Sequence, residues 1–295
     1  MPRIGGRAVG VASLVALTLV WGTTFPAIKA VVSSIGFAYY VALRFGLATL
    51  LLMPVAARRA HELRRYLRPG AALGLLYFSG ITLQGLGMEF TTASNAAFVT
   101  GLSVVMVYVI EVLLGAEKPS PELTGAVALA TLGMYLLSLS GSPLQLAVGD
   151  LIVLVGALFW ALQIIAVDRL SSGSLTTLLL MECGITAAAA SILSPLTGPL
   201  PLGGLRAALP HLLYLALVCT PIANALQLYG QRWVRSVDAA LIYLLEPVFA
   251  ALFSFIFLGE MMKPRQAVGA LLILTAMAVS SLRYRNAGRQ PLARG

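Results

Sequence analysis

Ten long apolar segments follow one another along the chain, each bounded by charged or turn-forming residues. Their estimated limits are 8–31, 36–57, 70–90, 94–115, 122–140, 149–169, 174–195, 209–231, 237–258 and 265–284. A helix needs about 20 apolar residues to cross a bilayer, and it satisfies its own backbone hydrogen bonds there. Alternating segments of about ten residues, which would indicate a β-barrel, do not occur. The pattern predicts an all-α integral membrane protein with ten transmembrane helices.

Composition agrees with this prediction and leaves no room for a soluble domain. Of the 295 residues, 59% are hydrophobic and 11% are charged, against about a quarter charged in an average soluble domain. Arg3 and Arg7 precede the first apolar segment, as in a signal peptide, but that segment is too long for one. We therefore expect the first segment to be a spanning helix within one membrane domain.

The net charge of +9 is distributed unevenly between the two sides of the predicted membrane protein. Loops on one side hold 15 Lys and Arg residues, and loops on the other side hold Arg206, Lys263 and Arg265. The first set is Arg3, Arg7, Arg58, Arg59, Arg64, Arg65, Arg68, Lys118, Arg169, Arg232, Arg235, Arg283, Arg285, Arg289 and Arg294. Basic loops face the cytoplasm, so we expect a multi-pass protein of the cell inner membrane with both termini cytoplasmic. The basic residues then meet membrane lipid, and nucleic acid is not an expected partner.

An internal repeat divides the chain into two halves. The segment LQGLGMEFTTASNAA at 83–97 aligns with LQLYGQRWVRSVDAA at 226–240, at an offset of 143 residues. This predicts a first five-helix repeat at 1–145, a second at 146–285 and a basic cytoplasmic tail at 286–295. Because five is odd, the second copy enters the membrane upside down. Inverted repeats are a common plan for secondary transporters, with a substrate site between them.

Polar side chains inside the predicted helices form matching stripes in the two copies. Tyr77, Ile81 and Gln84 share one face of the third span, and Asn224 and Gln227 share one face of the eighth. Polar groups within a bilayer are costly and tend to face a cavity. Hydrogen bonding between helices is the alternative for each residue taken separately.

The ninth span contains a carboxyl group beside a proline. Pro247 removes a backbone donor and can bend the helix, and Glu246 and Tyr243 lie at the same place. Glu246 is a candidate substrate or proton site, and the alternative is a structural cap on the bent helix. Glu111 and Glu182 are also expected within the membrane, where Arg44 is a possible partner for these carboxylates.

Aromatic residues in the first and sixth spans are candidates for the walls of a binding site. Trp21 lies in the first span, and Trp160 shares a helical face with Gln163 in the sixth. Aromatic rings can stack on a flat ligand. Ordinary core packing is the alternative interpretation.

Enzyme signatures are missing from the sequence. GxxxxGK[ST], HExxH and GxSxG do not occur, so no catalytic residues are predicted. The two cysteines, Cys183 and Cys219, and the two histidines, His61 and His211, lack metal-ligand spacing. We expect neither a metal nor a cofactor.

Several short sequences in a fixed order carry a family resemblance. They are Trp21-Gly22-Thr23-Thr24-Phe25, Leu43-Arg44-Phe45, Leu245-Glu246-Pro247, Leu258-Gly259-Glu260 and Gly269. Over roughly residues 10–283 the chain resembles the drug/metabolite transporter superfamily, in its EamA branch of ten-helix exporters. The first repeat departs from the family pattern, with Ser103 in place of a common proline and Ala116 between Gly115 and Glu117. This departure puts strict symmetry of the two helix breaks in doubt.

The resemblance implies a basket-like bundle around a central cavity, with the fifth and tenth helices at the periphery. Within the family, the chain looks most like the aromatic amino-acid exporters of the YddG type. We expect a secondary transporter, monomeric or homodimeric, that exports small metabolites, in particular amino acids including aromatic ones, by alternating access. The alternatives are export or facilitated passage of other solutes or drugs, and a sensory or structural membrane role. The expected substrate-binding residues are Trp21, Tyr77, Ile81, Gln84, Trp160, Gln163, Asn224, Gln227, Tyr243 and Glu246.

Overall fold

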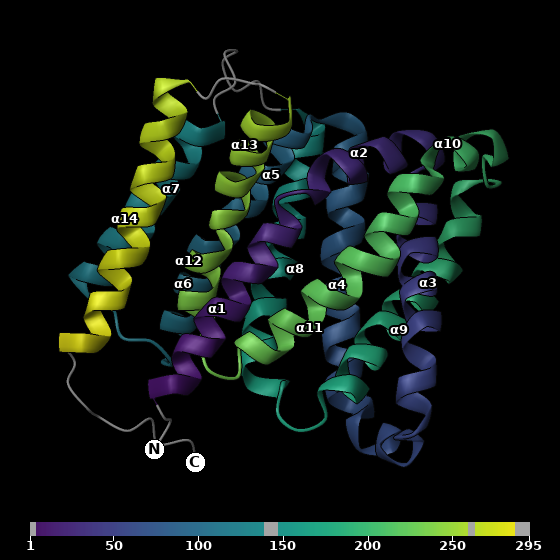
Figure 1. Cartoon of the computed structure of the whole chain (residues 1–295), viewed down its shortest axis with the longest axis horizontal. Helices are drawn as coiled ribbons and strands as arrows, with labels where there is room; N and C mark the ends of the chain where they lie inside the picture. The colour runs from purple at the N-terminus through teal and green to yellow at the C-terminus, as the bar shows by residue number, and fades with distance from the viewer. Residues whose placement is uncertain (1–3, 139–146, 259–262, 287–295) are drawn as a thin grey trace.

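The computed structural model describes residues 4–138, 147–258 and 263–286, and these residues form helices without any strand (Figure 1). Short 3-10 turns occur at Ala60–Glu62 and Ser194–Thr197, and a π-helical segment occurs at Tyr214–Cys219. The α-helices are α1 Ile4–Trp21, α2 Thr24–Ile35, α3 Phe37–Ala57, α4 Leu63–Phe90, α5 Ala93–Gly101, α6 Ser103–Leu113, α7 Pro121–Ser138, α8 Val148–Leu170, α9 Leu175–Leu193, α10 Leu202–Leu213, α11 Thr220–Gly230, α12 Ser236–Tyr243, α13 Leu245–Leu258 and α14 Pro264–Asn286.

All ten predicted apolar segments are helical where the structure describes them. Seven helical segments in the described chain are long and apolar enough to cross a membrane, and the bent pair of α1 and α2 makes an eighth candidate. α7 and α14 contribute shorter apolar helices at Pro121–Leu137 and Pro264–Ser280. The prediction of an all-helical membrane protein is confirmed. The family motif residues Gly259 and Glu260 lie outside the described residues. The predicted boundary between the two repeats near residue 145 and most of the tail at 286–295 also lie outside them.

Apolar side chains cover the outside of the bundle. Leu50, Leu75, Leu113, Leu151 and Leu271 are each more than half exposed. In water such a surface would be unstable, whereas lipid tails accept it without cost. The interior holds two buried apolar clusters, one built mainly on α2, α3, α4 and α9 and the other on α1, α7, α12 and α14.

Glycine allows close crossings between helices, and two of these crossings have corresponding places in the two halves of the chain. A Cβ atom at Gly149 of α8 would lie 2.4 Å from the Gly87 oxygen of α4, and one at Gly10 of α1 would lie 2.9 Å from the Gly230 oxygen of α11. Small residues let helix backbones approach closely inside a membrane. These crossings join α4 to α8 and α1 to α11, so each connects the first half of the chain to the second.

Polar contacts tie helix ends together at the edge of the bundle where α1 begins and α14 ends, drawn at the bottom of Figure 1 and called here the lower edge. The Glu111 carboxylate accepts hydrogen bonds from Arg169 Nη2 and Ser236 Oγ, both at 3.0 Å. Arg235 Nη1 lies 3.3 Å from the Glu117 carboxylate. Arg232 donates to the carbonyl oxygen of Ser171 at 2.8 Å, where a cation suits the end of α8.

The opposite, upper edge has its own polar links. Lys29 of α2 donates to the carbonyl oxygens of Met88 and Thr91 at the end of α4. This explains how a lysine is accommodated in the first apolar segment, because a cation compensates the negative end of a helix. Thr91 in turn donates to Asp150 Oδ1 at 2.6 Å, and Asp150 Oδ2 accepts from the Ala147 amide at the start of α8.

Candidate substrate cavity

Breaks in helices meet at the centre of the bundle. The first predicted span, 8–31, is two helices that bend by 43° between Trp21 and Thr24. Pro26 has no N–H to donate to the carbonyl of Gly22, which interrupts the helix. The hydroxyls of Thr23 and Thr24 donate instead to the carbonyls of Val20 and Trp21, at 2.7 and 2.8 Å. The sequence WGTTFP therefore produces a helix break in which threonine hydroxyls bond the carbonyls of Val20 and Trp21.

The spans at 94–115 and 237–258 are also interrupted. The second breaks at Leu244, where Pro247 cannot donate to the Tyr243 carbonyl. The first breaks at Leu102, before Ser103, although no proline follows. The departure of the first repeat from the family pattern therefore does not remove its helix break.

The breaks in α1–α2 and α12–α13 lie against each other. A Cβ atom at Gly22 would lie 3.0 Å from Phe249 Cβ and 3.1 Å from the Glu246 carbonyl oxygen. A Cβ atom at position 22 is therefore in tight contact with α13, which would have to shift by a few tenths of an ångström to accept it. The close approach fixes Glu246, in the first turn of α13, beside the end of α1.

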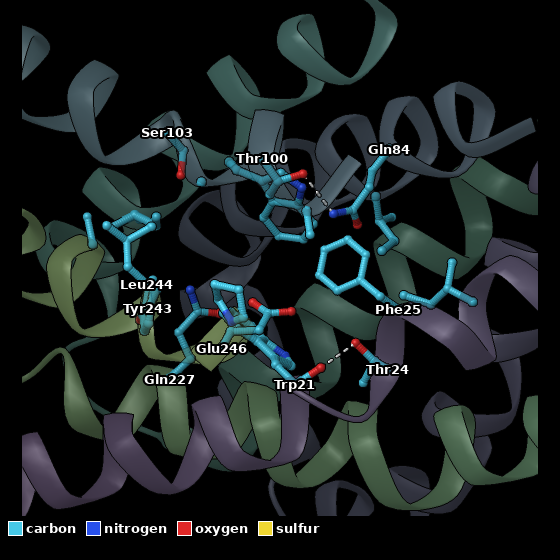
Figure 2. A pocket seen from close by; sticks show the side chains of 18 of the residues that line it. Trp21, Thr24, Phe25, Gln84, Thr100, Ser103, Gln227, Tyr243, Leu244 and Glu246 are labelled. Carbon is cyan, nitrogen blue, oxygen red and sulfur yellow. Dashed lines mark hydrogen bonds between the residues drawn. The ribbon is translucent and has the colours of Figure 1, made fainter. Parts of the chain in front are cut away.

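A cavity opens at this junction, with an empty volume of about 780 Å³ including its mouth. Figure 2 shows Trp21, Phe25, Gln84, Gln227, Tyr243 and Glu246 around the space. Eight of the ten residues expected from the sequence line it: Trp21, Tyr77, Ile81, Gln84, Trp160, Gln227, Tyr243 and Glu246.

The other two expected residues, Gln163 and Asn224, lie behind the cavity wall. Gln163 Nε2 donates to Glu182 Oε1 at 3.0 Å, and Asn224 Nδ2 donates to Glu182 Oε2 at 3.2 Å. Gln227 Nε2 donates to Gln163 Oε1 at 2.9 Å, and Tyr77 OH donates to Asn224 Oδ1 at 3.2 Å. These buried residues hold Tyr77 and Gln227 in place from behind.

Aromatic rings form two parts of the wall. Tyr77 packs edge-on against Trp160, with ring centroids 4.8 Å apart, and against Phe45 at 5.2 Å. Trp21 packs edge-on against Tyr243 at 5.2 Å. Such contacts fix the rings and leave apolar surface for a ligand.

Amide and hydroxyl groups supply hydrogen-bonding positions on the wall. Gln84 Nε2 donates to Thr100 Oγ1 at 3.1 Å (Figure 2). Tyr243 OH donates to Gln231 Oε1 at 2.9 Å, and Gln231 donates to the Ile164 carbonyl oxygen at 2.8 Å. The polar side of the cavity is therefore built from connected, oriented groups.

Arg44 of α3 also lines the cavity, with 2% of its surface exposed. Its Nε donates to Thr220 Oγ1 at 2.7 Å, and its Nη1 donates to Tyr40 OH. Thr220 follows the π-helical segment, and its own hydroxyl donates to the Leu215 carbonyl oxygen at 2.9 Å. π-helical turns are frequent at functional sites, and this one presents Thr220 to Arg44.

The sequence identified Arg44 only as a possible partner of buried carboxylates. In the structure Glu111 is bound by Arg169, and Glu182 is bound by amides. None of the ion pairs within the described residues involves Arg44 or Glu246. The same part of the chain holds no cluster of three or more His, Cys, Asp or Glu side chains that could bind a metal ion.

A polar cavity enclosed by apolar, membrane-crossing helices is typical of a solute transporter. The chain belongs to the EamA-like transporter family, whose model matches residues 8–139 and again 147–282. An uncharacterized transporter of Archaeoglobus fulgidus is 33% identical over 94% of this chain and 89% of its own length. A second uncharacterized transporter of that organism is 25% identical over 91% of this chain and 96% of its own length.

A solved crystal structure of a protein shares the fold, with a TM-score of 0.79 and 18% identity over 97% of this chain and all of that one. The family and the names of the relatives indicate a multi-pass membrane transporter rather than an enzyme.

Proposed function

We propose that this chain is a secondary transporter that exports small metabolites, in particular amino acids including aromatic ones, across the inner membrane. The observation that carries the proposal is the central cavity, because both halves of the chain contribute aromatic and polar groups to it. Aromatic walls formed by Trp21, Tyr77, Trp160 and Tyr243 would hold an apolar side chain. The amides of Gln84 and Gln227 would hydrogen-bond its polar end.

Ten crossings of the membrane are supported by helix lengths. To the seven long spans and the bent pair, α7 and α14 add apolar helices at Pro121–Leu137 and Pro264–Ser280. Each of these has 17 residues, at the lower limit of about 17–25 for a spanning helix. An even number of crossings brings both termini to one side, as the proposal requires.

Three observations support two inverted repeats, at 1–145 and 146–285. The family model matches the chain twice, with the gap at 140–146. The glycine crossing of α4 on α8 has a counterpart in the crossing of α11 on α1. α1 begins at the lower edge, whereas α8 ends there, so the first helices of the two copies run in opposite directions (Figure 1).

The same arrangement supports alternating access and a cytoplasmic lower edge. Polar contacts between the two halves gather at the lower edge, where Glu111 meets Arg169 and Glu117 meets Arg235. Basic loops face the cytoplasm, which supports placing this edge and both termini there. Alternating access would require the links at the lower edge and those at the upper edge to break and re-form in turn.

Uptake into proteoliposomes tests the proposal directly. Purified protein would be supplied with labelled phenylalanine, threonine or a sugar, with and without a pH gradient. Phenylalanine uptake above that of empty liposomes is expected, and its dependence on the gradient distinguishes proton coupling from facilitated passage. Uptake of the sugar alone favours a transporter of other solutes. Folded protein that binds these ligands without moving them favours a sensor.

The double variant Gln84→Ala and Gln227→Ala tests the cavity. We expect phenylalanine uptake to fall at least tenfold, since two hydrogen bonds at about 1 kcal/mol each correspond to roughly 30-fold in affinity. Gln266→Ala is a matched control, because Gln266 bonds the Leu137 carbonyl oxygen away from the cavity. Normal uptake by a folded double variant contradicts the proposed site.

A further inference from the structure

The cavity contains two charged side chains that the proposed aromatic and amide contacts leave unused. Among the described residues that line it, Arg44 and Glu246 are the charged ones, and they have opposite signs. They come from opposite halves of the chain, and no ion pair of the described chain joins them. The cavity therefore offers a separated positive and negative group with no net charge.

The guanidinium of Arg44 is held in one orientation with donors to spare. Its hydrogen bonds to other described residues are those to Thr220 and Tyr40, and both use neutral oxygens. A guanidinium has five N–H donors. It also lies 5.4 Å from the ring centroid of Phe45, which packs on the wall residue Tyr77. Arg44 is thus fixed on the cavity wall, with N–H groups left over.

A buried cation without an anion is unfavourable inside a membrane. An anion that enters the cavity would compensate it, and a carboxylate fits best because its two oxygens match the guanidinium fork. Arg44 is therefore suited to bind a carboxylate of the substrate rather than a neutral hydroxyl.

Glu246 is placed to accept a cation. It lies in the first turn of α13, where the helix dipole favours negative charge. The end of α1 packs against the backbone of α13 at Gly22. The Trp21 ring also lines the cavity there, and an aromatic face attracts a cation. A carboxylate and an aromatic ring together suit an ammonium group.

We propose that the substrate is a zwitterion, with its carboxylate bound by Arg44 and its ammonium group bound by Glu246. The inference rests on the proposed transport function and assigns the charged contacts of the same cavity. The substrate bridges two groups that do not pair with each other, so each becomes compensated only when the cavity is occupied. The site then prefers amino acids over amines, over monocarboxylates and over neutral sugars.

Analogues that lack one charge test this preference in the unaltered protein. Proteoliposomes would take up labelled phenylalanine in competition with unlabelled L-phenylalanine, 3-phenylpropionate or phenethylamine. The second compound lacks the ammonium group and the third lacks the carboxylate. We expect each to inhibit at least about tenfold more weakly than phenylalanine, because a hydrogen bond to a charged group changes affinity by that order.

Two variants assign each charge to its residue. In Arg44→Gln, phenylalanine should lose its advantage over phenethylamine and keep its advantage over 3-phenylpropionate. In Glu246→Gln the reverse is expected. Arg232→Gln is the matched control, since Arg232 lies at the lower edge and should leave both preferences intact. Thermal melting of each variant shows whether it folds.

The outcomes separate this inference from the function on which it rests. Phenylalanine uptake that all three compounds inhibit equally overturns the zwitterion site and leaves the amino-acid transporter standing. Variants that fold and keep both preferences also overturn it. Absence of phenylalanine uptake by folded, unaltered protein overturns the proposed function and this inference together. If Arg44→Gln does not fold, the analogue series on the unaltered protein still decides.

Discussion

Among the described residues, charged side chains have ion-pair partners at the lower edge and lack them in the cavity. At the lower edge, the Glu111 side chain is 4% exposed and is bound by Arg169 and Ser236. In the cavity, Arg44 and Glu246 have no ion-pair partner among the described residues. The Glu111 carboxylate and the Arg44 guanidinium are both buried, so the physical cost of leaving either charge uncompensated is similar.

The difference separates a structural role from a binding role. A compensated charge stabilises one arrangement of helices, and its removal should reduce stability without changing substrate preference. An uncompensated charge costs stability in the empty protein and is explained by a ligand that compensates it. Variants in the two regions should therefore affect different measurements.

Glu111→Ala should have the largest effect on stability. It removes the acceptor of two hydrogen bonds, one from a cation, and leaves Ser236 Oγ without that partner. Arg169 is half exposed and can return to water, so we expect a loss of about 1–3 kcal/mol in the free energy of unfolding. Thermal melting in detergent measures it.

Glu122→Ala is the control, because Glu122 is exposed at the start of α7, and its loss should be much smaller. The preference of Glu111→Ala for phenylalanine over phenethylamine should equal that of the unaltered protein. A changed preference, or unchanged melting, contradicts the structural role of this contact.

Thr220→Val should have an intermediate effect, on transport rather than on stability. It removes the oxygen that accepts from Arg44 Nε and leaves the charge in place. With its orientation loosened, Arg44 should bind the substrate about fivefold more weakly, as for a hydrogen bond of about 1 kcal/mol. The concentration of phenylalanine that gives half-maximal uptake measures this.

Thr186→Val provides the matched control, because Thr186 is equally buried but donates to the Gly74 carbonyl oxygen away from the cavity. It should leave the half-maximal concentration unchanged. An equal change in both variants would mean that the effect comes from general loosening of the bundle and not from Arg44.

The apolar pattern was sufficient to predict where the long apolar helices lie in the described chain, because hydrophobic length is set by the bilayer and not by distant contacts. The pattern could not decide which of two neighbouring faces of a helix lines the cavity. On α8 the cavity is lined by Trp160 and Ile164, whereas Gln163 points towards Glu182 of α9. Positions three and four residues apart flank the same stripe, so only the neighbouring helix decides which of them faces the space.

The partners of Arg44 illustrate the second limit. Thr220 is 176 positions away, and its orientation depends on a π-helical turn that the sequence pattern does not indicate. The break after Trp21 had a readable signal, since Pro26 lies four residues after Gly22. The sequence therefore carries a signal for the helix break near Pro26, whereas it carries none for the contact between Arg44 and Thr220.

Glu62→Gln should have the smallest effect, and it tests a charge at the lower edge outside the membrane spans. Hydrogen bonding by Ser174 and by Thr177 holds the pKa of the Glu62 carboxyl below its usual value. Thr177 Oγ1 donates to Glu62 Oε2 at 2.8 Å, which links α9 to the start of α4. Because the folded-state pKa is lowered, the ionised carboxylate adds stability above the unfolded pKa of about 4.3.

That contribution disappears as the pH falls through the lowered pKa of the folded protein. At pH 7 the unaltered protein should therefore melt at a slightly higher temperature than Glu62→Gln, and the difference should vanish towards pH 3. Melting curves of both proteins in detergent across this range measure it, and uptake at pH 7 should be the same for both. A difference that persists at pH 3 would assign the effect to packing of the side chain instead of its charge. A loss of phenylalanine preference would place Glu62 in the substrate path and remove the distinction between lower edge and cavity.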